Sequence, residues 1–175
     1  VTIVAGATDE LQPPSGAEGI KVGSTREMQQ AMADRAPDAD VVIMAAAVAD
    51  FRPEAEADTK LKKGQADDAL STIRLTENPD ILKGLVEMRE AGDTAATVIG
   101  FAAETDNELE NGRAKLKRKG ADMLMLNSVA GGGVFGQARN RGWLLSADGR
   151  EEEIPDGTKH EVAARIWDAI ERLSQ

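Results

Sequence analysis

The chain of 175 residues contains no cysteine, and this absence excludes disulfide bonds and thiolate metal sites. Histidine occurs only as His160, so a metal site built from several histidines is not expected. The sequence also lacks a run of about eighteen apolar residues, which excludes a transmembrane helix. These absences, together with 41% hydrophobic and 30% charged residues, favour a cytoplasmic globular protein in which residues 1–175 form a single domain.

Positive charge is scarce as well, because the formal net charge is −10. Surfaces that bind nucleic acids need clustered lysine and arginine, so a nucleic-acid partner is not expected. Two basic clusters nevertheless stand out against the acidic background, at residues 60–63 and 113–119. A cleft lined by these clusters would concentrate a positive potential on a small phosphate ligand.

Several common catalytic patterns are also missing. The dinucleotide fingerprint G-x-G-x-x-G does not occur, and only Gly6 follows the first strand-like segment. The lysine motif of P-loop proteins and the serine nucleophile elbow are absent too. A catalytic triad would have to use His160, which we place in the first turn of a solvent-exposed helix. These absences weaken the case for a nicotinamide dehydrogenase and for a serine hydrolase.

Strand-like and helix-like segments alternate along the chain, and several strands are continuously apolar. This alternation predicts an α/β fold: a three-layer, Rossmann-like, mostly parallel sheet with helices on both faces and an antiparallel hairpin near the C-terminus. Residues 52–65 are polar and without periodicity, so we expect a loop there. Strands are expected at 1–5, 20–22, 41–47, 71–76, 97–102, 122–126, 141–145 and 151–154, and helices at 24–34, 78–90, 107–119 and 158–173.

Capping residues mark three of the expected helix starts. Ser24 with Glu27, and Thr158 with Glu161, fit the capping box, in which the two side chains satisfy helix amides that lack partners. In the run 78–80, asparagine is expected as the N-cap, proline as the first helical residue and aspartate in the first turn. The free amides of such a helix start can also bind anionic oxygens.

Four segments carry the candidate binding residues. The helix after the last of them presents Lys115 and Lys119 four residues apart, hence on one face. Because the carboxyl ends of neighbouring strands line one crevice in an open α/β sheet, we expect the four segments to meet at one site. They are the strand end 44–50, which closes with an aspartate, the basic run 60–63, the helix start 78–82 and the strand end 100–105.

These segments resemble the motifs of the phosphopantothenoylcysteine synthetase family. In order, they read AAAVADF at 45–51, KLKK at 60–63, NPDIL at 78–82 and GFAAET at 100–105. The resemblance runs from Val1 to the final helix. One of these motifs alone would be weak evidence for the family, whereas four motifs in the same order are specific evidence. The stretch NRGW at 140–143 is similar to the actinobacterial branch. In bacteria this family usually forms the C-terminal half of a bifunctional coenzyme A biosynthesis protein.

The resemblance implies a ligase that condenses 4′-phosphopantothenate with cysteine. In the bacterial type, the pantothenate carboxylate attacks the α-phosphate of CTP and forms an acyl-cytidylate, and cysteine then displaces CMP. Lysines, a metal ion and helix amides suit this chemistry, because they stabilise the charge on leaving pyrophosphate. The resemblance further implies Mg²⁺, a homodimer and fusion to a flavin-dependent decarboxylase, with no flavin in this chain.

The resemblance also assigns roles to individual residues. Lys60 is implied as the principal catalytic residue, on a loop that closes over the site and acts mainly on the acyl-cytidylate. Asp50 and Asp80 are the candidate acids near the metal. The implied nucleotide contacts are Met44, Ala45, Ala46, Asp50, Lys60, Pro79, Asp80, Ile81, Leu82, Phe101, Lys115 and Lys119.

Simpler structural roles exist for several of these residues. Asp50 also fits an ordinary turn, and Phe101 fits an ordinary core position. Lys115 and Lys119 also fit a role in complementing the negative end of their helix. At the level of function two alternatives remain, another Rossmann-like nucleotide-binding enzyme and a non-catalytic nucleotide-binding assembly domain.

One departure from the family pattern concerns the start of the chain. The family has a glycine-rich strand–loop–helix, which helps to hold phosphopantothenate and the nucleotide phosphates, and no segment here matches it. The chain begins with Val1 rather than methionine. We therefore expect a domain that lacks its first segment.

Overall fold

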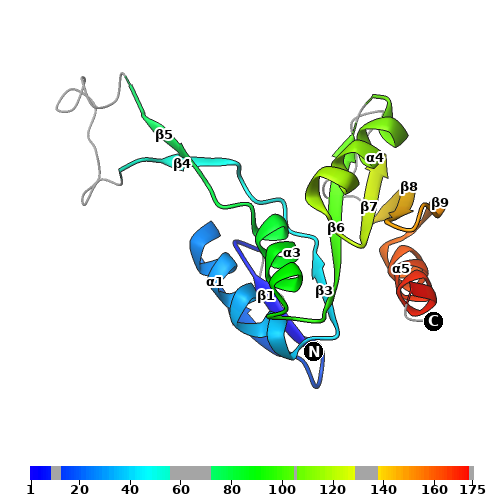
Figure 1. The fold of residues 1–175 in the computed structure, drawn as a ribbon, viewed down its shortest axis with the longest axis horizontal. Coiled ribbons are helices and arrows are strands. Elements are labelled where there is room, and N and C mark those ends of the chain that lie inside the picture. Colours follow the sequence, from blue (N-terminus) through cyan, green and yellow to red (C-terminus); the bar gives the residue numbers. More distant parts are fainter. Residues whose placement is uncertain (9–12, 56–71, 105, 129–137, 174–175) are drawn as a thin grey trace. The chain divides into compact units, whose positions relative to one another are not determined.

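A computed structural model describes residues 1–8, 13–55, 72–104, 106–128 and 138–173 of the chain (Figure 1). Its residues form two compact units, each of which is described by itself. The smaller unit comprises residues 1–31 and 47–80, and the larger unit comprises residues 32–46 and 81–175. That residues 1–175 form one domain stays a prediction.

The larger unit is built on a five-stranded sheet with the strand order β3-β6-β7-β8-β9 (Figure 1). β3, β6 and β7 are parallel, whereas β8 and β9 form a hairpin that continues the sheet in the antiparallel sense. The predicted parallel core with an antiparallel hairpin is therefore confirmed. The strands are β3 Val41–Met44, β6 Thr97–Glu104, β7 Met123–Ser128, β8 Arg139–Ser146 and β9 Glu151–Thr158.

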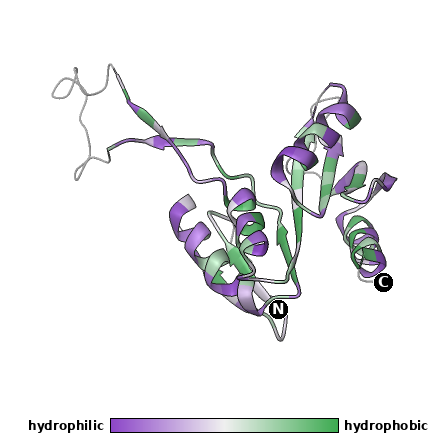
Figure 2. Ribbon diagram, in the orientation of Figure 1, coloured by the Kyte–Doolittle hydropathy of each residue, from purple (hydrophilic) through white to green (hydrophobic). Residues whose placement is uncertain are grey.

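One face of this sheet packs against α5 (Lys159–Leu173). The helix contributes residues at intervals of three and four to a core cluster, as an amphipathic helix does. Ile99 and Met125 of the sheet belong to the same cluster and are completely buried. Figure 2 shows hydrophobic residues along the strands of this sheet and on part of α5. The predicted apolar stripe is confirmed, with Ile166, Ala169, Ile170 and Leu173 all in or against the cluster.

The opposite face packs against α3 (Ile81–Ala91) and α4 (Glu108–Lys119). A Cβ atom added to Gly112 of α4 would lie 2.7 Å from a Cδ atom of Leu126 in β7. A Cβ atom added to Gly100 of β6 would likewise lie 2.6 Å from a Cδ atom of Leu82 in α3. Both glycines therefore allow a helix to approach the sheet closely. The larger unit thus has the three layers that the sequence predicts.

The smaller unit contains two short two-stranded sheets. β1 (Thr2–Ala5) and β2 (Glu18–Lys21) are parallel, whereas β4 (Phe51–Pro53) and β5 (Leu75–Glu77) form an antiparallel ribbon. The larger part of α1 (Thr25–Arg35) also belongs to this unit. The strand predicted at 1–5 is confirmed, and the one predicted at 20–22 begins two residues earlier.

The capping box predicted for α5 is present, and the one predicted for α1 differs in that the Glu27 carboxylate bonds to Gly23 instead of Ser24. The Ser24 hydroxyl accepts a hydrogen bond from the Glu27 N–H at 3.2 Å, and the Glu27 carboxylate accepts one from the Gly23 N–H at 2.6 Å. At α5, the Glu161 carboxylate accepts hydrogen bonds from the Thr158 N–H and hydroxyl at 2.7 and 2.9 Å. Within the described ranges, every helix is too short or too polar to cross a lipid bilayer.

Several local predictions are wrong. Within the range 71–76 predicted as a strand, residues 72–74 are not in a strand and β5 begins at Leu75, and the strand predicted at 41–47 ends at Met44. The loop predicted at 52–65 is part of β4 over its first two residues, because cross-strand pairing with β5 outweighs the polar local sequence. Asn78 is not the N-cap of a helix that starts at Pro79, since α3 begins at Ile81. The Asn78 side chain bonds to the chain before β4 instead. The helices predicted after residues 107 and 158 begin within one residue of the expected positions.

Candidate functional site

The carboxyl ends of three parallel strands form one edge of the larger unit. β3 ends at Met44, which lies beside Gly100 of β6, while Glu104 and Ser128 are register partners at the ends of β6 and β7. The alanines at 45 and 46 follow β3 directly and are exposed. Small side chains leave the backbone open to a ligand, and ligands of open α/β sheets bind at this edge.

The start of α3 is held against this edge. The Leu82 side chain fills the space beside Gly100, where a Cβ atom would lie only 2.6 Å from it. Because Gly100 pairs in register with Met44, the structure brings Met44, Leu82 and Gly100 together. Ile81 is buried at the first position of the helix. Within the larger unit, three of the four candidate segments therefore contribute a residue to this group of neighbours.

Phe101 lies on the other face of the sheet. Successive strand residues point to opposite faces, so Phe101 points away from Gly100 and packs, half-buried, against the core cluster beneath α5. This packing accounts for the side chain as a core residue. Its contact with a nucleotide stays a prediction.

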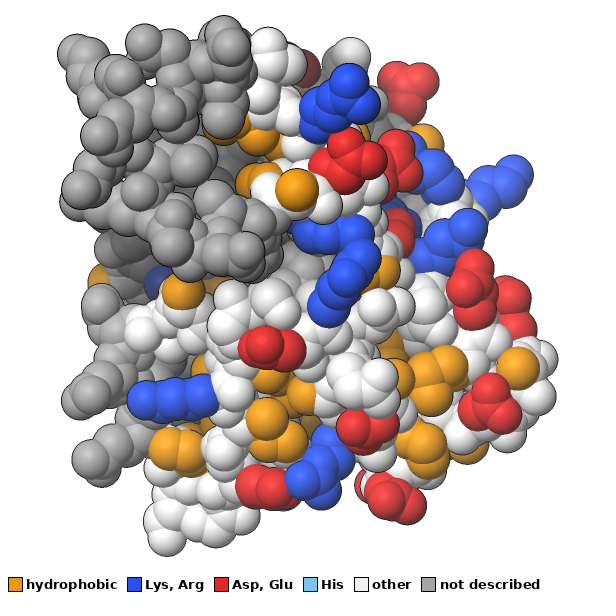
Figure 3. Space-filling model, turned by 90° about the vertical axis from the view of Figure 1, so that its left-hand side faces the viewer, with side chains coloured by type: hydrophobic (Ala, Val, Ile, Leu, Met, Phe, Trp, Pro, Cys, Tyr) orange, Lys and Arg blue, Asp and Glu red, His pale blue; other side chains and the backbone are white. Residues whose placement is uncertain are grey.

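The two candidate lysines of α4 are not equivalent. Lys115 Nζ lies 3.0 Å from Glu104 Oε1, and the two side chains are only 29% and 21% exposed. Part of the Lys115 charge is therefore already neutralised at the end of β6. Lys119 lies four residues further along α4, in its last turn. On the face drawn in Figure 3, basic and acidic side chains are interspersed.

In the smaller unit, a backbone hydrogen bond joins the two segments that carry the candidate acids Asp50 and Asp80. The Asn78 N–H donates to the Asp50 carbonyl oxygen at 2.8 Å, and Asn78 Nδ2 donates to the Ala49 carbonyl oxygen at 2.8 Å. Asp80 follows Asn78 by two residues, with Pro79 between them. Asp50 and Asp80 are both exposed. Their side chains therefore extend from neighbouring stretches of backbone.

Lys60 and the rest of the basic run 60–63 lie outside the described residues. The other candidates divide between the two units: Asp50, Pro79 and Asp80 belong to the smaller one. That all four segments meet at one site therefore stays a prediction.

The chemistry of the donors is compatible with Mg²⁺. The part of the chain that the structure describes contains no group of three or more His, Cys, Asp or Glu side chains placed to hold a metal. Mg²⁺ does not need such a group, because it keeps several waters and is often held by one or two carboxylates together with substrate phosphates. That Asp50 and Asp80 hold Mg²⁺ in this way stays a prediction.

Sequence reasoning missed three residues that shape these segments. Arg52 donates through Nη1 to the Asn78 side-chain oxygen at 3.2 Å and also to the Glu77 carbonyl oxygen. Asn78 was assigned to helix capping, and Glu104 was not singled out from its motif. The roles of Arg52 and Asn78 follow from the pairing of β4 with β5. The sequence does not show this pairing, because each of the two strands is only three residues long.

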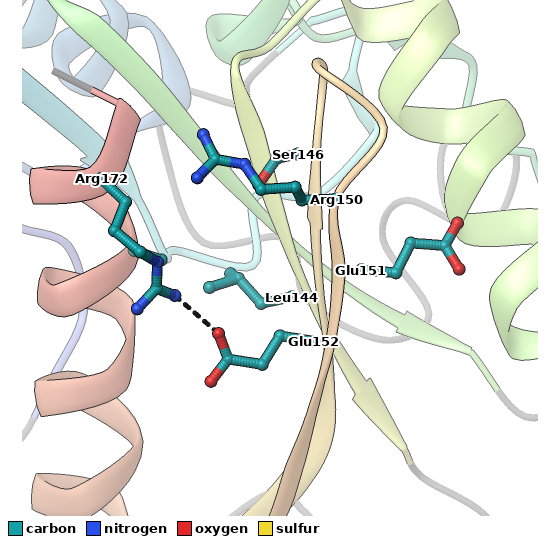
Figure 4. A pocket seen from close by; sticks show the side chains of 7 residues that line it. Leu144, Ser146, Arg150, Glu151, Glu152 and Arg172 are labelled. Carbon is teal, nitrogen blue, oxygen red and sulfur yellow. Dashed lines mark hydrogen bonds and ion pairs between the residues drawn. The ribbon is translucent and has the colours of Figure 1, made fainter. Parts of the chain in front are cut away.

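Two surface cavities of the larger unit are lined by none of the candidate residues, although one of them reaches Ser128 at the carboxyl edge of the sheet. One, of ≈ 370 Å³, is lined by residues of α4, β7, β8 and β9, including Ser128 and Trp143. The other, of ≈ 340 Å³, lies between the β8–β9 hairpin and α5 (Figure 4). There, Arg172 and Glu152 point toward one another across the cavity and pair at 2.6 Å. Since opposite charges neutralise each other there, this cavity has little attraction for an anion.

Glu151 and Glu152, which line the second cavity, and Asp148 in the adjoining hairpin turn pair with arginines. A hydrogen bond from Arg113 lowers the pKa of Glu151, and a hydrogen bond from Arg150 lowers the pKa of Asp148. Both carboxylates are therefore charged at neutral pH and engaged with their partners. We place the candidate site at the carboxyl edge of the sheet rather than in either cavity.

Three layers and a parallel core define the larger unit as an open α/β domain, a class in which ligands bind at the carboxyl ends of the strands. The comparison with known families agrees with this class. The chain belongs to the family of the DNA/pantothenate metabolism flavoprotein C-terminal domain, whose model matches residues 1–173.

Similar proteins lead to the same family. The chain is 44% identical over 176 residues to the Coenzyme A biosynthesis bifunctional protein CoaBC of Mycolicibacterium smegmatis, covering 97% of this chain and 42% of that protein. It is 36% identical over 167 residues to a cysteine/cysteine sulfinic acid decarboxylase of an unknown prokaryotic organism, covering 95% of this chain and 45% of that protein. The chain thus spans less than half the length of these curated relatives.

A solved structure supports the fold. The crystal structure of the C-terminal domain of CoaBC superimposes with a TM-score of 0.78 at 34% sequence identity, covering 99% of this chain and 74% of that one. The α/β fold and the family expected from the sequence motifs are therefore both confirmed.

Proposed function

We propose that this chain is the phosphopantothenate–cysteine ligase part of a coenzyme A biosynthesis protein. The observation that carries the proposal is the family match over residues 1–173, together with 44% identity to a bifunctional coenzyme A biosynthesis protein over nearly the whole chain. The arrangement of Met44, Leu82 and Gly100 at the carboxyl edge of the sheet supports it. CTP is the proposed co-substrate.

The proposed CTP contacts are the candidate residues of the sequence motifs. The alanines after β3 offer exposed backbone, and the start of α3 offers helix amides that suit phosphate oxygens. Lys115 supplies positive charge beside the end of β6, and Lys119 is proposed to do so further along α4. The proposed contacts are Met44, Ala45, Ala46, Asp50, Lys60, Pro79, Asp80, Ile81, Leu82, Phe101, Lys115 and Lys119.

Asp50 and Asp80 are the residues that would hold Mg²⁺, because both are exposed carboxylates on adjoining backbone segments. When bound, the ion would neutralise charge on the triphosphate and on the leaving pyrophosphate. The Asn78 hydrogen bonds orient the backbone that carries Asp50 and thereby prepare this donor pair.

The proposed reaction has two balanced steps. A carboxylate oxygen of 4′-phosphopantothenate bonds to the α-phosphorus of CTP, and the bond to pyrophosphate breaks. The amine of cysteine then attacks the acyl carbon, loses a proton, and CMP leaves with the oxygen that linked it to the acyl group. Positioning and electrostatic stabilisation suffice for both steps. Lys60 is proposed to act mainly in the second step.

The proposed setting follows the relatives. The relative from Mycolicibacterium smegmatis is a bifunctional protein, so we propose fusion to a decarboxylase domain at the natural length of the protein. A homodimer and a cytoplasmic location are proposed with it. No flavin is proposed for the residues of this chain.

Release of pyrophosphate tests the proposal. The protein at its natural length is incubated with CTP, 4′-phosphopantothenate, cysteine and Mg²⁺, and pyrophosphate and CMP are measured. We expect both products, and without cysteine we expect pyrophosphate only up to the amount of enzyme. Absence of release with any nucleoside triphosphate would contradict the ligase and leave a non-catalytic assembly domain. Tighter binding of a nicotinamide cofactor than of CTP would favour a different nucleotide-binding enzyme.

The role of Lys60 is tested with Lys60→Gln. This variant is expected to bind CTP nearly as well as the wild type but to convert the acyl-cytidylate slowly, so pyrophosphate release without cysteine persists while amide formation falls. Lys159→Gln, at the start of α5, is the matched control, since it removes one exposed lysine elsewhere. Unchanged amide formation in Lys60→Gln would remove Lys60 from the mechanism.

A further inference from the structure

The base of the β4–β5 ribbon carries a hydrogen-bond network that the motifs do not explain. Arg52 Nη1 donates to the carbonyl oxygen of Glu77 and, at 3.2 Å, to Asn78 Oδ1. Asn78 Nδ2 donates to the Ala49 carbonyl oxygen at 2.8 Å, and the Asn78 N–H donates to the Asp50 carbonyl oxygen at 2.8 Å. Arg52 and Asn78 therefore join the chain entering β4 to the chain leaving β5.

Apolar packing contributes little to the ribbon itself. Each strand has three residues, and Phe51 and Leu75 are 53% and 61% exposed. Two-stranded ribbons of this kind are only marginally stable in water when nothing packs on them. The conformation at the base of the ribbon therefore depends on the bonds made by Arg52 and Asn78.

These bonds act on the backbone of both candidate acids. The Asp50 carbonyl oxygen is itself an acceptor in the network, so the orientation of its peptide group is set there. On the other side, Pro79 restricts the backbone between Asn78 and Asp80, because its ring fixes φ. A change at Asn78 would consequently move Asp50 and Asp80 relative to each other.

We propose that Arg52 and Asn78 are positioning residues that hold Asp50 and Asp80 at the separation required by a divalent cation bound to CTP. The inference rests on the proposed function, because it takes Asp50 and Asp80 as the donor pair. Neither positioning residue is assigned a contact with the nucleotide. Groups that orient metal-binding side chains in this way typically change metal affinity by about 10–100-fold when they are replaced.

Binding of Mn²⁺–CTP provides a test that does not depend on turnover. Mn²⁺ serves as the probe, measured by electron paramagnetic resonance, and CTP alone is measured by calorimetry, both with the protein at its natural length. For Arg52→Gln we expect Mn²⁺–CTP affinity to fall by about 10–100-fold. Affinity for CTP without metal should fall by much less, because the other proposed contacts remain.

Asn78→Asp tests the bond from Asn78 to Ala49 separately from the bond between Arg52 and Asn78. The new carboxylate still accepts from Arg52, but it cannot donate to the Ala49 carbonyl oxygen and repels it instead. We expect a loss of Mn²⁺–CTP affinity comparable to that of Arg52→Gln. Arg52→Lys, which keeps one donor and the charge, should restore part of the affinity. If Arg52→Gln fails to fold, as judged by circular dichroism, Asn78→Asp decides.

Arg74→Gln is the matched control, because it removes an exposed arginine beside β5. Its affinity for Mn²⁺–CTP should equal that of the wild type.

Two results would overturn the inference. One is an equal loss of CTP affinity with and without metal in Arg52→Gln and Asn78→Asp, which would indicate a purely structural role. The other is no loss of Mn²⁺–CTP affinity in these variants. If the wild type neither binds CTP nor releases pyrophosphate, the proposed function fails and the inference falls with it. A fully active wild type with unaffected variants overturns the inference alone.

Discussion

The two compact units are stabilised in different ways. The larger unit buries the centre of its sheet completely, and residues 123–126 of β7 have no exposed side-chain surface. The ribbon of the smaller unit leaves Phe51, Ile73 and Leu75 53%, 63% and 61% exposed. Its strands are joined instead by backbone pairing and by the hydrogen bonds of Arg52 and Asn78.

The difference in packing distinguishes a rigid scaffold, the larger unit, from a ribbon in the smaller unit that can change its conformation more easily. Close packing fixes side chains in one arrangement, and a change of one methylene group is felt across such a core. A ribbon held by a few polar bonds opens at a lower free-energy cost, as is typical of ligand-binding segments. We therefore expect substitutions in the larger unit to change stability and substitutions at the ribbon base to change binding.

The largest expected effect is that of Leu124→Ala in β7. Leu124 is completely buried, and replacing such a leucine by alanine leaves a cavity that costs about 2–5 kcal/mol of unfolding free energy. The matched substitution Leu75→Ala in the ribbon removes an exposed side chain and should change it by less than about 0.5 kcal/mol. Chemical denaturation of both variants measures the contrast, and equal losses would show that the ribbon face is covered.

Gly142→Ala should have the next largest effect. A Cβ atom at Gly142 would lie 1.8 Å from the carbonyl oxygen of Leu126, so β7 and β8 would have to move apart. Overpacking of this kind costs about 1–3 kcal/mol, and more where backbone is displaced. Gly84→Ala in α3 is the control, because its Cβ would meet no atom within 4 Å. There, alanine should stabilise the helix by about 0.5–1 kcal/mol, and an equal loss at both sites would contradict the packing argument.

The sequence predicts the larger unit better than the smaller one, and the reason is physical. Buried strands such as Thr97–Glu104 and the amphipathic α5 carry patterns set by burial, which a sequence displays directly. Gly142 and Arg52 carry no such pattern. The clash at Gly142 exists only once β7 and β8 are paired, and the bonds of Arg52 exist only once β4 and β5 are paired.

The candidate site shows the same limit. The motif order predicted that the end of β3, the segment that begins at Gly100 and the start of α3 lie together, because strand ends share an edge in this fold. Met44, Leu82 and Gly100 are neighbours in the structure, and their role in one binding site stays a prediction. The pairing of Lys115 with Glu104 was not predicted, although both lie in the candidate segments. Sequence shows which residues carry charge, whereas their pairing depends on the packing of α4 on β6.

A smaller effect is expected where the scaffold meets the proposed CTP site, at Lys115 and Glu104. Lys115→Gln should weaken CTP binding by about tenfold, or about 1.4 kcal/mol, if the ammonium contacts a phosphate. Glu104→Gln should act in the opposite direction and tighten binding, because it releases Lys115 from its partner at 3.0 Å. Calorimetry with CTP measures both. Lys117→Gln on the exposed side of α4 is the control, and weaker binding in Glu104→Gln would mean that Glu104 positions the lysine.

The smallest expected effect is the pH dependence of the α5 capping box. Hydrogen bonds from the Thr158 N–H and hydroxyl lower the pKa of Glu161 below its ordinary value. A carboxylate whose pKa is lower in the folded state stabilises that state above its unfolded pKa and loses this contribution as the pH falls through its folded pKa. The melting temperature of the wild type should therefore exceed that of Glu161→Gln at pH 6.

That difference should shrink as the solution is acidified, since glutamine does not titrate. Thermal unfolding of both proteins between pH 6 and pH 3 measures it, and a constant difference would mean that the bond to Thr158 does not depend on charge. The bonds of Arg52 to Glu77 and of Asn78 to Ala49 involve no carboxylate. Acid should thus weaken a helix start of the larger unit while leaving the base of the ribbon intact, so the larger unit is the more sensitive of the two to acid as well as to the packing substitutions.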